Sequence, residues 1–182
     1  SEEAPSNYFY SIGSIMHDFT FVNTEGKYLT LSNELYEKDM ILINIWATWC
    51  GPCAYEFPFM EEAYQEYKDS VSIFALSYDD SNSSIRAYKR EKGLSFDMGH
   101  DTSVIQHVQT NGIPTTLIVD RYGMITDIHI GALTSAAAFK EIFEKHVGDD
   151  YKPDVKLDTG NDDDGGEEQE ETRVKPTVSM PS

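Results

Sequence analysis

Basic residues are scarce in this 182-residue chain, where 14 Lys and Arg stand against 32 Asp and Glu, and the formal net charge is −18. A surface of that charge repels phosphate backbones and anionic lipid headgroups, so nucleic acid is excluded as an expected partner. Long apolar stretches are missing as well. No run of 18 apolar residues occurs, and the N-terminus lacks the apolar core of a signal peptide, so no membrane-spanning segment is predicted.

Cysteine is rarer still, since Cys50 and Cys53 are the only two. A disulfide across so short a loop constrains little of the unfolded chain, so bracing the fold is a poor explanation for the pair. Structural zinc needs two further ligands. The available histidines do not pair at the usual short spacing: His17, His100, His107, His129 and His146. We therefore predict no metal site, keep zinc as a minor alternative, and favour electron exchange.

Apolar patterning predicts a mixed α/β fold. The runs MILINIWA (40–47) and VSIFALSY (71–78) are typical of strands buried on both faces. Turn residues at 23–26 predict a hairpin over 18–31. Further predictions are a helix from the cysteines to about 68, helices over 81–93, 101–112 and from Thr134 or Ser135 to about 147, a short strand over 94–99, and strands over 115–120 and 124–131. This order indicates a mixed central sheet with helices on both faces.

Composition divides the chain into three parts. Residues 1–14 show no clear period and form an N-terminal extension, and residues 15–148 form the domain. Residues 149–182 contain seven Asp and four Glu against three Lys and one Arg, a local net charge of −7. Because this segment has almost no large apolar residue, it cannot offset the entropy of ordering, and we predict an acidic, disordered tail or linker.

The two cysteines fall where a buried strand ends and a helix begins. Unpaired N–H groups and the helix dipole stabilise a thiolate at that position, so we assign Cys50 as the nucleophile. Cys53, one turn later, resolves the mixed disulfide by attacking Cys50. Gly51 leaves the first sulfur uncrowded, and Pro52 suits an early helical position. No cofactor is expected beyond this redox-active disulfide.

The motif WATWCGPC, followed downstream by GIPTT, resembles the thioredoxin superfamily. More narrowly, the chain is similar to the TlpA/ResA-like extracytoplasmic thiol–disulfide oxidoreductases over roughly residues 15–147. The predicted hairpin, the phrase GPCAYEFPFM and the separation of 61 positions between Cys53 and Pro114 all resemble that subfamily. The resemblance implies a thioredoxin-like three-layer sandwich with an N-terminal hairpin extension and an extra strand–helix element. It also implies an extracytoplasmic protein, secreted or membrane-anchored, whose signal or anchor is absent from a chain that begins at Ser1.

The resemblance assigns roles to further residues. Pro114 matches the cis-proline that faces the cysteines, and Ile113 before it would offer its backbone to an extended substrate. Glu56 matches a glutamate that tunes the acidity of the cysteines and shuttles protons, the alternative being a helix glutamate in water. Asn44 stands where thioredoxin carries a buried aspartate, and an amide cannot take a proton. Trp49 adjoins Cys50 and is predicted to form part of an apolar docking surface.

The Gly–Pro dipeptide between the cysteines is that of thioredoxin, whose potential is about −270 mV. We therefore expect a reductant of disulfides in other proteins. The resemblance implies that these substrates are extracytoplasmic and that the electrons come from an upstream membrane donor, and we expect a monomer. A thioredoxin-fold peroxidase is one alternative, although Ala47 departs from the Thr-x-x-Cys context of peroxiredoxins. A surface-displayed binding module with a vestigial C-x-x-C pair is the other.

Overall fold

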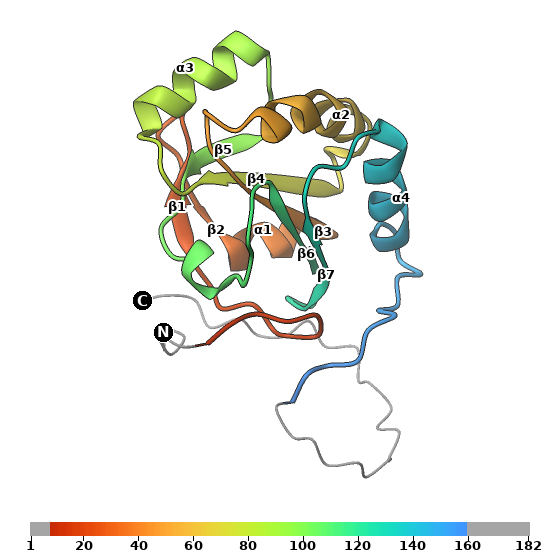
Figure 1. Ribbon diagram of the computed structural model, residues 1–182. Coiled ribbons are helices and arrows are strands. Elements are labelled where there is room, and N and C mark those ends of the chain that lie inside the picture. The colour runs from red at the N-terminus through yellow and green to blue at the C-terminus, as the bar shows by residue number, and fades with distance from the viewer. Residues whose placement is uncertain (1–7, 160–182) are drawn as a thin grey trace.

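A computed structural model describes residues 8–159, which form a mixed sheet in the order β5-β4-β3-β6-β7 with helices on both faces (Figure 1). The strands are β1 (Thr20–Val22), β2 (Tyr28–Thr30), β3 (Met40–Trp46), β4 (Val71–Ser77), β5 (Asp97–His100), β6 (Thr115–Asp120) and β7 (Ile125–Ile130). The helices are α1 (Leu31–Glu37), α2 (Gly51–Tyr67), α3 (Asn82–Lys92), the one-turn 3-10 helix η1 (Ile105–His107) and α4 (Ala136–His146). Strand β3 is parallel to β4 and antiparallel to β6, which confirms the predicted mixed sheet.

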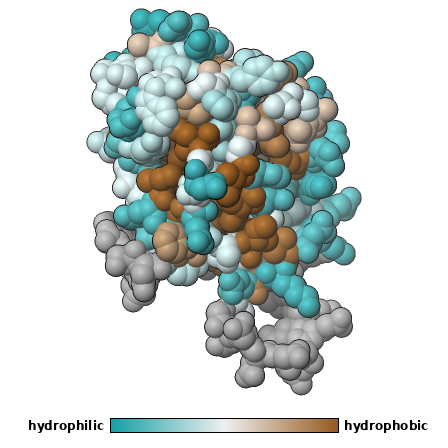
Figure 2. Space-filling view, viewed as in Figure 1, coloured by the Kyte–Doolittle hydropathy of each residue, from teal (hydrophilic) through white to brown (hydrophobic). Residues whose placement is uncertain are grey.

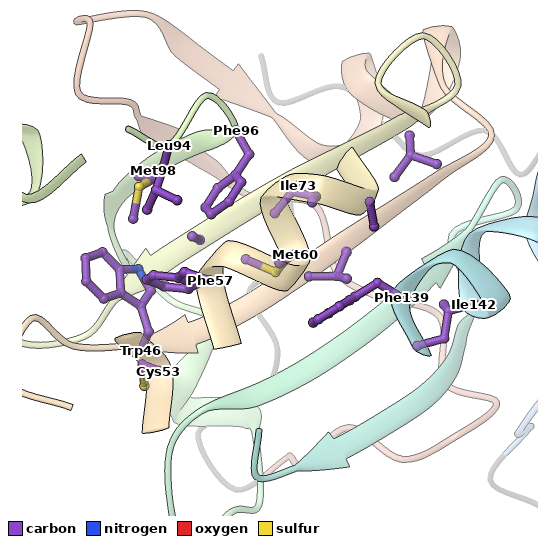
Figure 3. Close-up of a cluster of buried hydrophobic side chains, with 14 of the residues drawn as sticks. Trp46, Cys53, Phe57, Met60, Ile73, Leu94, Phe96, Met98, Phe139 and Ile142 are labelled. Atoms are coloured by element: carbon purple, nitrogen blue, oxygen red, sulfur yellow. The ribbon is translucent and has the colours of Figure 1, made fainter. Parts of the chain in front are cut away.

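The central strand β3 is buried along its whole length, as its apolar run predicts. Successive side chains point to opposite faces, so the strand contributes to two cores. One core lies under α2, α3 and α4, where Trp46 packs edge-on against Phe57. Figure 3 shows Cys53 at one end of this cluster, next to Trp46. The other core takes the alternate β3 residues together with α1 and the β1–β2 hairpin, namely Ile41, Ile43, Ile45, Phe19, Phe21, Leu29, Leu31 and Leu35.

Side-chain caps fix the helix boundaries that the sequence predicted. Ser81 accepts the N–H of Ser84 at the start of α3, and Gly93 ends that helix in the left-handed region with φ of 67°. Ser135 opens α4 in the same way. Helix α1 was not predicted, and the residue before it, Thr30, makes no side-chain capping bond. The signal on which the prediction relied is therefore missing at that helix.

The predicted helix over 101–112 is wrong. The Asp101 carboxylate accepts the N–H groups of Val104 and Ile105, but only the single turn η1 follows. Val108 is already extended, with φ of −106° and ψ of 116°. The Thr110 hydroxyl then bonds to nearby backbone groups, an arrangement that competes with helix formation. This stretch runs as an irregular segment into β6.

Segments at both ends of the described residues lie against the start of β7. Gly13 donates its N–H to the Ile125 carbonyl at 2.7 Å and accepts the N–H of Asp158 at 2.9 Å. The Tyr151 hydroxyl donates to the Asp120 carboxylate at 2.7 Å. Residues 149–159 of the predicted tail therefore contact the domain, whereas 1–7 and 160–182 lie outside the described residues. Within 8–159, no helix is long and apolar enough to cross a membrane.

Candidate active site

Cys50 and Cys53 form a disulfide at the N-terminus of α2, with their Cα atoms 5.3 Å apart. Cys50 is the N-cap residue, and its Sγ accepts the backbone N–H of Cys53 at 3.2 Å. Cys53 is fully buried, whereas Cys50 keeps 5% of its surface exposed. A partner can therefore reach the first sulfur and not the second, which is the asymmetry that a nucleophile and a resolving thiol require.

The two residues between the cysteines are both exposed. A Cβ added at Gly51 would meet no atom within 4 Å, so the glycine leaves space for a partner rather than avoiding a clash within the chain. Pro52 lies in the first turn of α2, where its missing N–H removes no helical hydrogen bond. Both residues keep the approach to the disulfide open.

The Ile113–Pro114 peptide bond is cis and faces the disulfide. The Ile113 carbonyl oxygen lies 3.7 Å from Cys50 Sγ. A cleft of about 690 Å³ opens here between the start of α2 and the segment leading into β6. It is lined by Trp49, Cys50, Gly51, Pro52, Tyr78, Ile105, Val108, Thr110, Asn111, Gly112 and Ile113. Figure 2 shows hydrophobic residues gathered in the middle of this face, over the region of η1, β6 and β7.

Trp49 forms one wall of this cleft and is 61% exposed. Its indole Nε1 donates to the Asp79 carboxylate at 2.8 Å, and its ring meets Tyr78 edge-on at 6.2 Å between centroids. Sequence reasoning missed Tyr78 and Asp79. Strands β3 and β4 are parallel, so their carboxyl ends share one sheet edge, and the polar residues after the 71–78 run were the signal for this contact.

Asp80 fixes the loop that precedes the disulfide. Its carboxylate accepts the Thr48 N–H at 2.8 Å, the Thr48 hydroxyl at 2.7 Å and the Ser77 hydroxyl at 2.7 Å. Burial acts to raise the pKa of Asp80, but the bonds from Ser77 and Thr48 outweigh it and hold the pKa below its ordinary value. Asp80 is thus an ionised anchor for the loop, and it was also missed from the sequence.

Glu56 lies one turn after Cys53 and is fully buried, so the alternative of a solvated helix glutamate does not hold. Its carboxylate accepts the Leu133 N–H at 2.6 Å and the Asn44 amide Nδ2 at 2.9 Å. Burial raises the pKa of Glu56 to about 7, although both hydrogen bonds act to lower it. A carboxyl group with this pKa can exchange a proton near neutral pH.

Asn44 joins Glu56 to the neighbouring strand. Its Nδ2 donates to Glu56 and also to the Thr116 hydroxyl oxygen at 3.1 Å. Its Oδ1 is buried and has no hydrogen-bond partner among the described residues. An unsatisfied buried acceptor costs about 1–3 kcal/mol, so the unpaired Oδ1 of Asn44 lowers the stability of the folded protein.

The structure brings most of the predicted site residues together around the cleft: Cys50, Cys53, Trp49, Gly51, Pro52, Ile113 and Pro114. Glu56 lies behind them in the core with Asn44. Within residues 8–159, no group of three His, Cys, Asp or Glu side chains has the geometry to hold a metal ion.

A model of the AhpC/TSA family matches residues 12–128. The chain belongs to the AhpC/TSA family. Among curated relatives of this family member, the thioredoxin-like protein YneN of Bacillus subtilis is 34% identical over 121 residues, covering 64% of this chain and 70% of that protein. The thiol-disulfide oxidoreductase ResA of Geobacillus kaustophilus is 31% identical over 140 residues, covering 75% and 76%.

Solved structures of similar fold include a thiol:disulfide interchange protein from Chlorobium tepidum, with a TM-score of 0.67 and 22% identity over 76% of this chain and 99% of that one. A putative protein disulfide isomerase from Bacteroides thetaiotaomicron has a TM-score of 0.66 at 25% identity, covering 76% and 91%. The predicted thioredoxin-like fold and the ResA-like resemblance are confirmed. With its Cys50–Cys53 disulfide, this AhpC/TSA family member is a thiol–disulfide oxidoreductase that acts on disulfide or dithiol proteins.

Proposed function

We propose that the chain reduces disulfide bonds of proteins outside the cytoplasm, with Cys50 as the nucleophile and Cys53 as the resolving thiol. The observation that carries this assignment is the unequal access to the two sulfurs at the start of α2. The Cys53 N–H that contacts Cys50 Sγ also stabilises negative charge on that sulfur.

The reaction has two exchanges. The Cys50 thiolate attacks a sulfur of the substrate disulfide, which forms a mixed disulfide and releases one substrate thiolate. Cys53 then gives up its proton and attacks Cys50 Sγ, which releases the second substrate thiolate and leaves the Cys50–Cys53 disulfide. The substrate gains two electrons, the protein loses two, and the substrate thiolates take protons from water.

Two neighbours serve these exchanges. The Ile113 carbonyl, 3.7 Å from Cys50 Sγ, is placed to pair with an extended substrate segment lying in the cleft. Glu56 takes the proton from Cys53, because it is buried one helical turn away and its pKa lies near 7. Asn44 cannot take a proton, so Glu56 fills the part that the buried aspartate fills in thioredoxin.

The redox direction is inferred from the Gly–Pro dipeptide, and the cellular location from the resemblance to ResA-like proteins. Gly–Pro between the cysteines favours a reductant, and a ResA-like protein is expected outside the cytoplasm, secreted or anchored, as a monomer supplied by a membrane electron donor. We expect no cofactor beyond the redox-active disulfide between Cys50 and Cys53.

Redox titration of the Cys50–Cys53 pair against glutathione or dithiol buffers tests the direction. We expect a potential near that of thioredoxin, about −270 mV, whereas a value near −120 mV with net oxidation of reduced substrates would reverse the direction.

Cys50→Ser is expected to abolish insulin reduction. Unchanged reduction by that variant would favour the binding-module alternative, and rapid reduction of one equivalent of peroxide by the reduced wild type, with formation of the Cys50–Cys53 disulfide, would favour a peroxidase. Cys53→Ser should trap the substrate as a mixed disulfide on Cys50.

A further inference from the structure

The buried amide of Asn44 presents an unusual imbalance. Both hydrogens of its Nδ2 are used, one on Glu56 Oε1 at 2.9 Å and one on the Thr116 hydroxyl at 3.1 Å. Its Oδ1 is equally buried but has no partner within the described part of the chain. Buried polar atoms are nearly always paired, so a lone acceptor beside an ionisable group calls for an explanation.

The protonation state of Glu56 supplies one. An ionised carboxylate only accepts hydrogen bonds, and Asn44 and Leu133 provide two donors for it. Once protonated, the same group has an O–H that needs an acceptor. The Leu133 N–H is a donor and cannot accept a hydrogen bond from this O–H. The Asn44 side chain can accept it, because its Oδ1 has no other partner among the described residues.

We propose that Asn44 is a positioning residue for proton exchange at Glu56, donating through Nδ2 to the carboxylate and accepting through Oδ1 from the carboxylic acid. The amide changes roles by rotating about its Cβ–Cγ bond. The Thr116 hydroxyl follows it, because a hydroxyl can either donate or accept. The inference rests on the proposed role of Glu56 as the proton acceptor of Cys53.

The surroundings of Glu56 leave this role to Asn44. The carboxylate of Glu56 accepts from Asn44 of β3 and from the Leu133 N–H in the loop before α4, Asn44 in turn bonds to Thr116 of β6, and Cys53 lies one turn earlier in α2. None of these carries a fixed charge, and no charged side chain of the described residues contributes to the pKa shift of Glu56. An aspartate in place of Asn44 would instead set a second carboxyl group against Glu56.

Magnetic resonance of the full chain tests the proposal directly, with ¹³C in the Glu56 carboxyl and the Asn44 side-chain carbonyl. We expect the Asn44 carbonyl signal to move with the same midpoint as Glu56. In Glu56→Gln, whose amide mimics the acid, the signal should stay at the wild type's low-pH position at every pH. An Asn44 signal that ignores the Glu56 titration, or a Glu56→Gln signal at the high-pH position, would overturn the proposal. Neither measurement needs a variant at Asn44.

Substitution gives an independent readout. Asn44→Leu removes the bonds to both protonation states, and because a hydrogen bond to the ionised carboxylate is the stronger one, the Glu56 midpoint should rise by about one pH unit. Disulfide reduction should then fall about fivefold at pH 7 and recover at pH 9. Asn23→Leu is the matched control, since Asn23 is also buried and binds a carboxylate, that of Asp97, at another site. An unmoved midpoint in Asn44→Leu refutes the inference.

The proposed function can fail separately from this inference. If Cys50→Ser still reduces insulin, the proposed function is wrong, yet the resonances of Asn44 and Glu56 remain readable. If Cys50→Ser is inactive while the Asn44 signal stays constant through the Glu56 titration, the proposed function stands and the inference is wrong.

Discussion

Two carboxylates are buried along the central strand β3, and they differ in what surrounds them. Asp120 pairs in register with Met40 at the start of the strand, whereas Glu56 bonds to Asn44 four residues further on. Burial raises the pKa of both groups, and hydrogen bonds act against it at both. A raised pKa alone therefore does not separate a catalytic acid from a structural one.

Their partners do separate them. Asp120 accepts the N–H groups of Tyr122 and Met124, both in the turn that follows it, and the Tyr151 hydroxyl. These donors hold the β6–β7 turn and residues 149–159 in place. Glu56 instead lies one turn from a buried thiol and shares an amide whose oxygen is unused. The comparison teaches that a raised pKa gains functional meaning from its place, since Glu56 lies one helical turn from Cys53 whereas the partners of Asp120 belong to a turn and to residues 149–159.

The largest expected difference between the two carboxylates is in catalysis. Glu56→Gln removes the proton acceptor of Cys53, and loss of such a group lowers a rate by about 10²- to 10⁴-fold. Asp120→Asn should leave the rate within about twofold, because Asp120 lies away from the cleft. Insulin reduction at pH 7 measures both variants. Equal losses in the two would remove the distinction drawn between them.

The next effect is on stability. Folding raises the pKa of Glu56 from its ordinary 4.5 to about 7, so between these values the folded state binds more protons than the unfolded state. The contribution of Glu56 to the free energy of unfolding therefore falls as pH rises, by about 3 kcal/mol between pH 4 and pH 8. Urea titrations of the disulfide-bonded protein should show that the free energy of unfolding falls by about 3 kcal/mol more in the wild type than in Glu56→Gln over this range.

Asp120 provides an internal control for that measurement. Its pKa is also raised, so its contribution has the same sign, but it is present in the wild type and in Glu56→Gln and cancels in the difference. If the two proteins show the same dependence on pH, Glu56 does not hold its proton as described.

Much of the fold was predictable because its signals are local. The apolar run of β3, the cap at Ser81 and the left-handed Gly93 each specify their own segment. The placement of Cys50 at a helix start followed from the same kind of signal. The helix predicted over 101–112 failed because Asp101 caps only one turn, and no periodic pattern shows that the chain then becomes extended.

The partners within the site were not predictable from local pattern. The N–H that bonds to Glu56 belongs to Leu133, 77 positions away in the sequence, and the hydroxyl beside Asn44 belongs to Thr116, 72 positions away. Such contacts depend on strand order and register. Burial of Glu56 was likewise not predictable, since a helix glutamate is normally solvated and its partners, Asn44 and Leu133, come from other parts of the chain.

The smallest predicted effect is on stability and concerns Asp120 alone. Tyr151→Phe removes the hydroxyl that donates to Asp120 but keeps the ring that stacks on His146 at 5.3 Å and lies under Arg121 at 5.0 Å. Losing one hydrogen bond to a charged, buried acceptor should lower the free energy of unfolding by about 1–2 kcal/mol, with insulin reduction unchanged. Tyr122→Phe is the matched control, because Tyr122 gives Asp120 only its backbone N–H, and it should change stability by less than about 0.5 kcal/mol. If Tyr151→Phe were as harmless as the control, the Tyr151 hydroxyl would contribute nothing to stability, and Asp120 would be held by its turn alone.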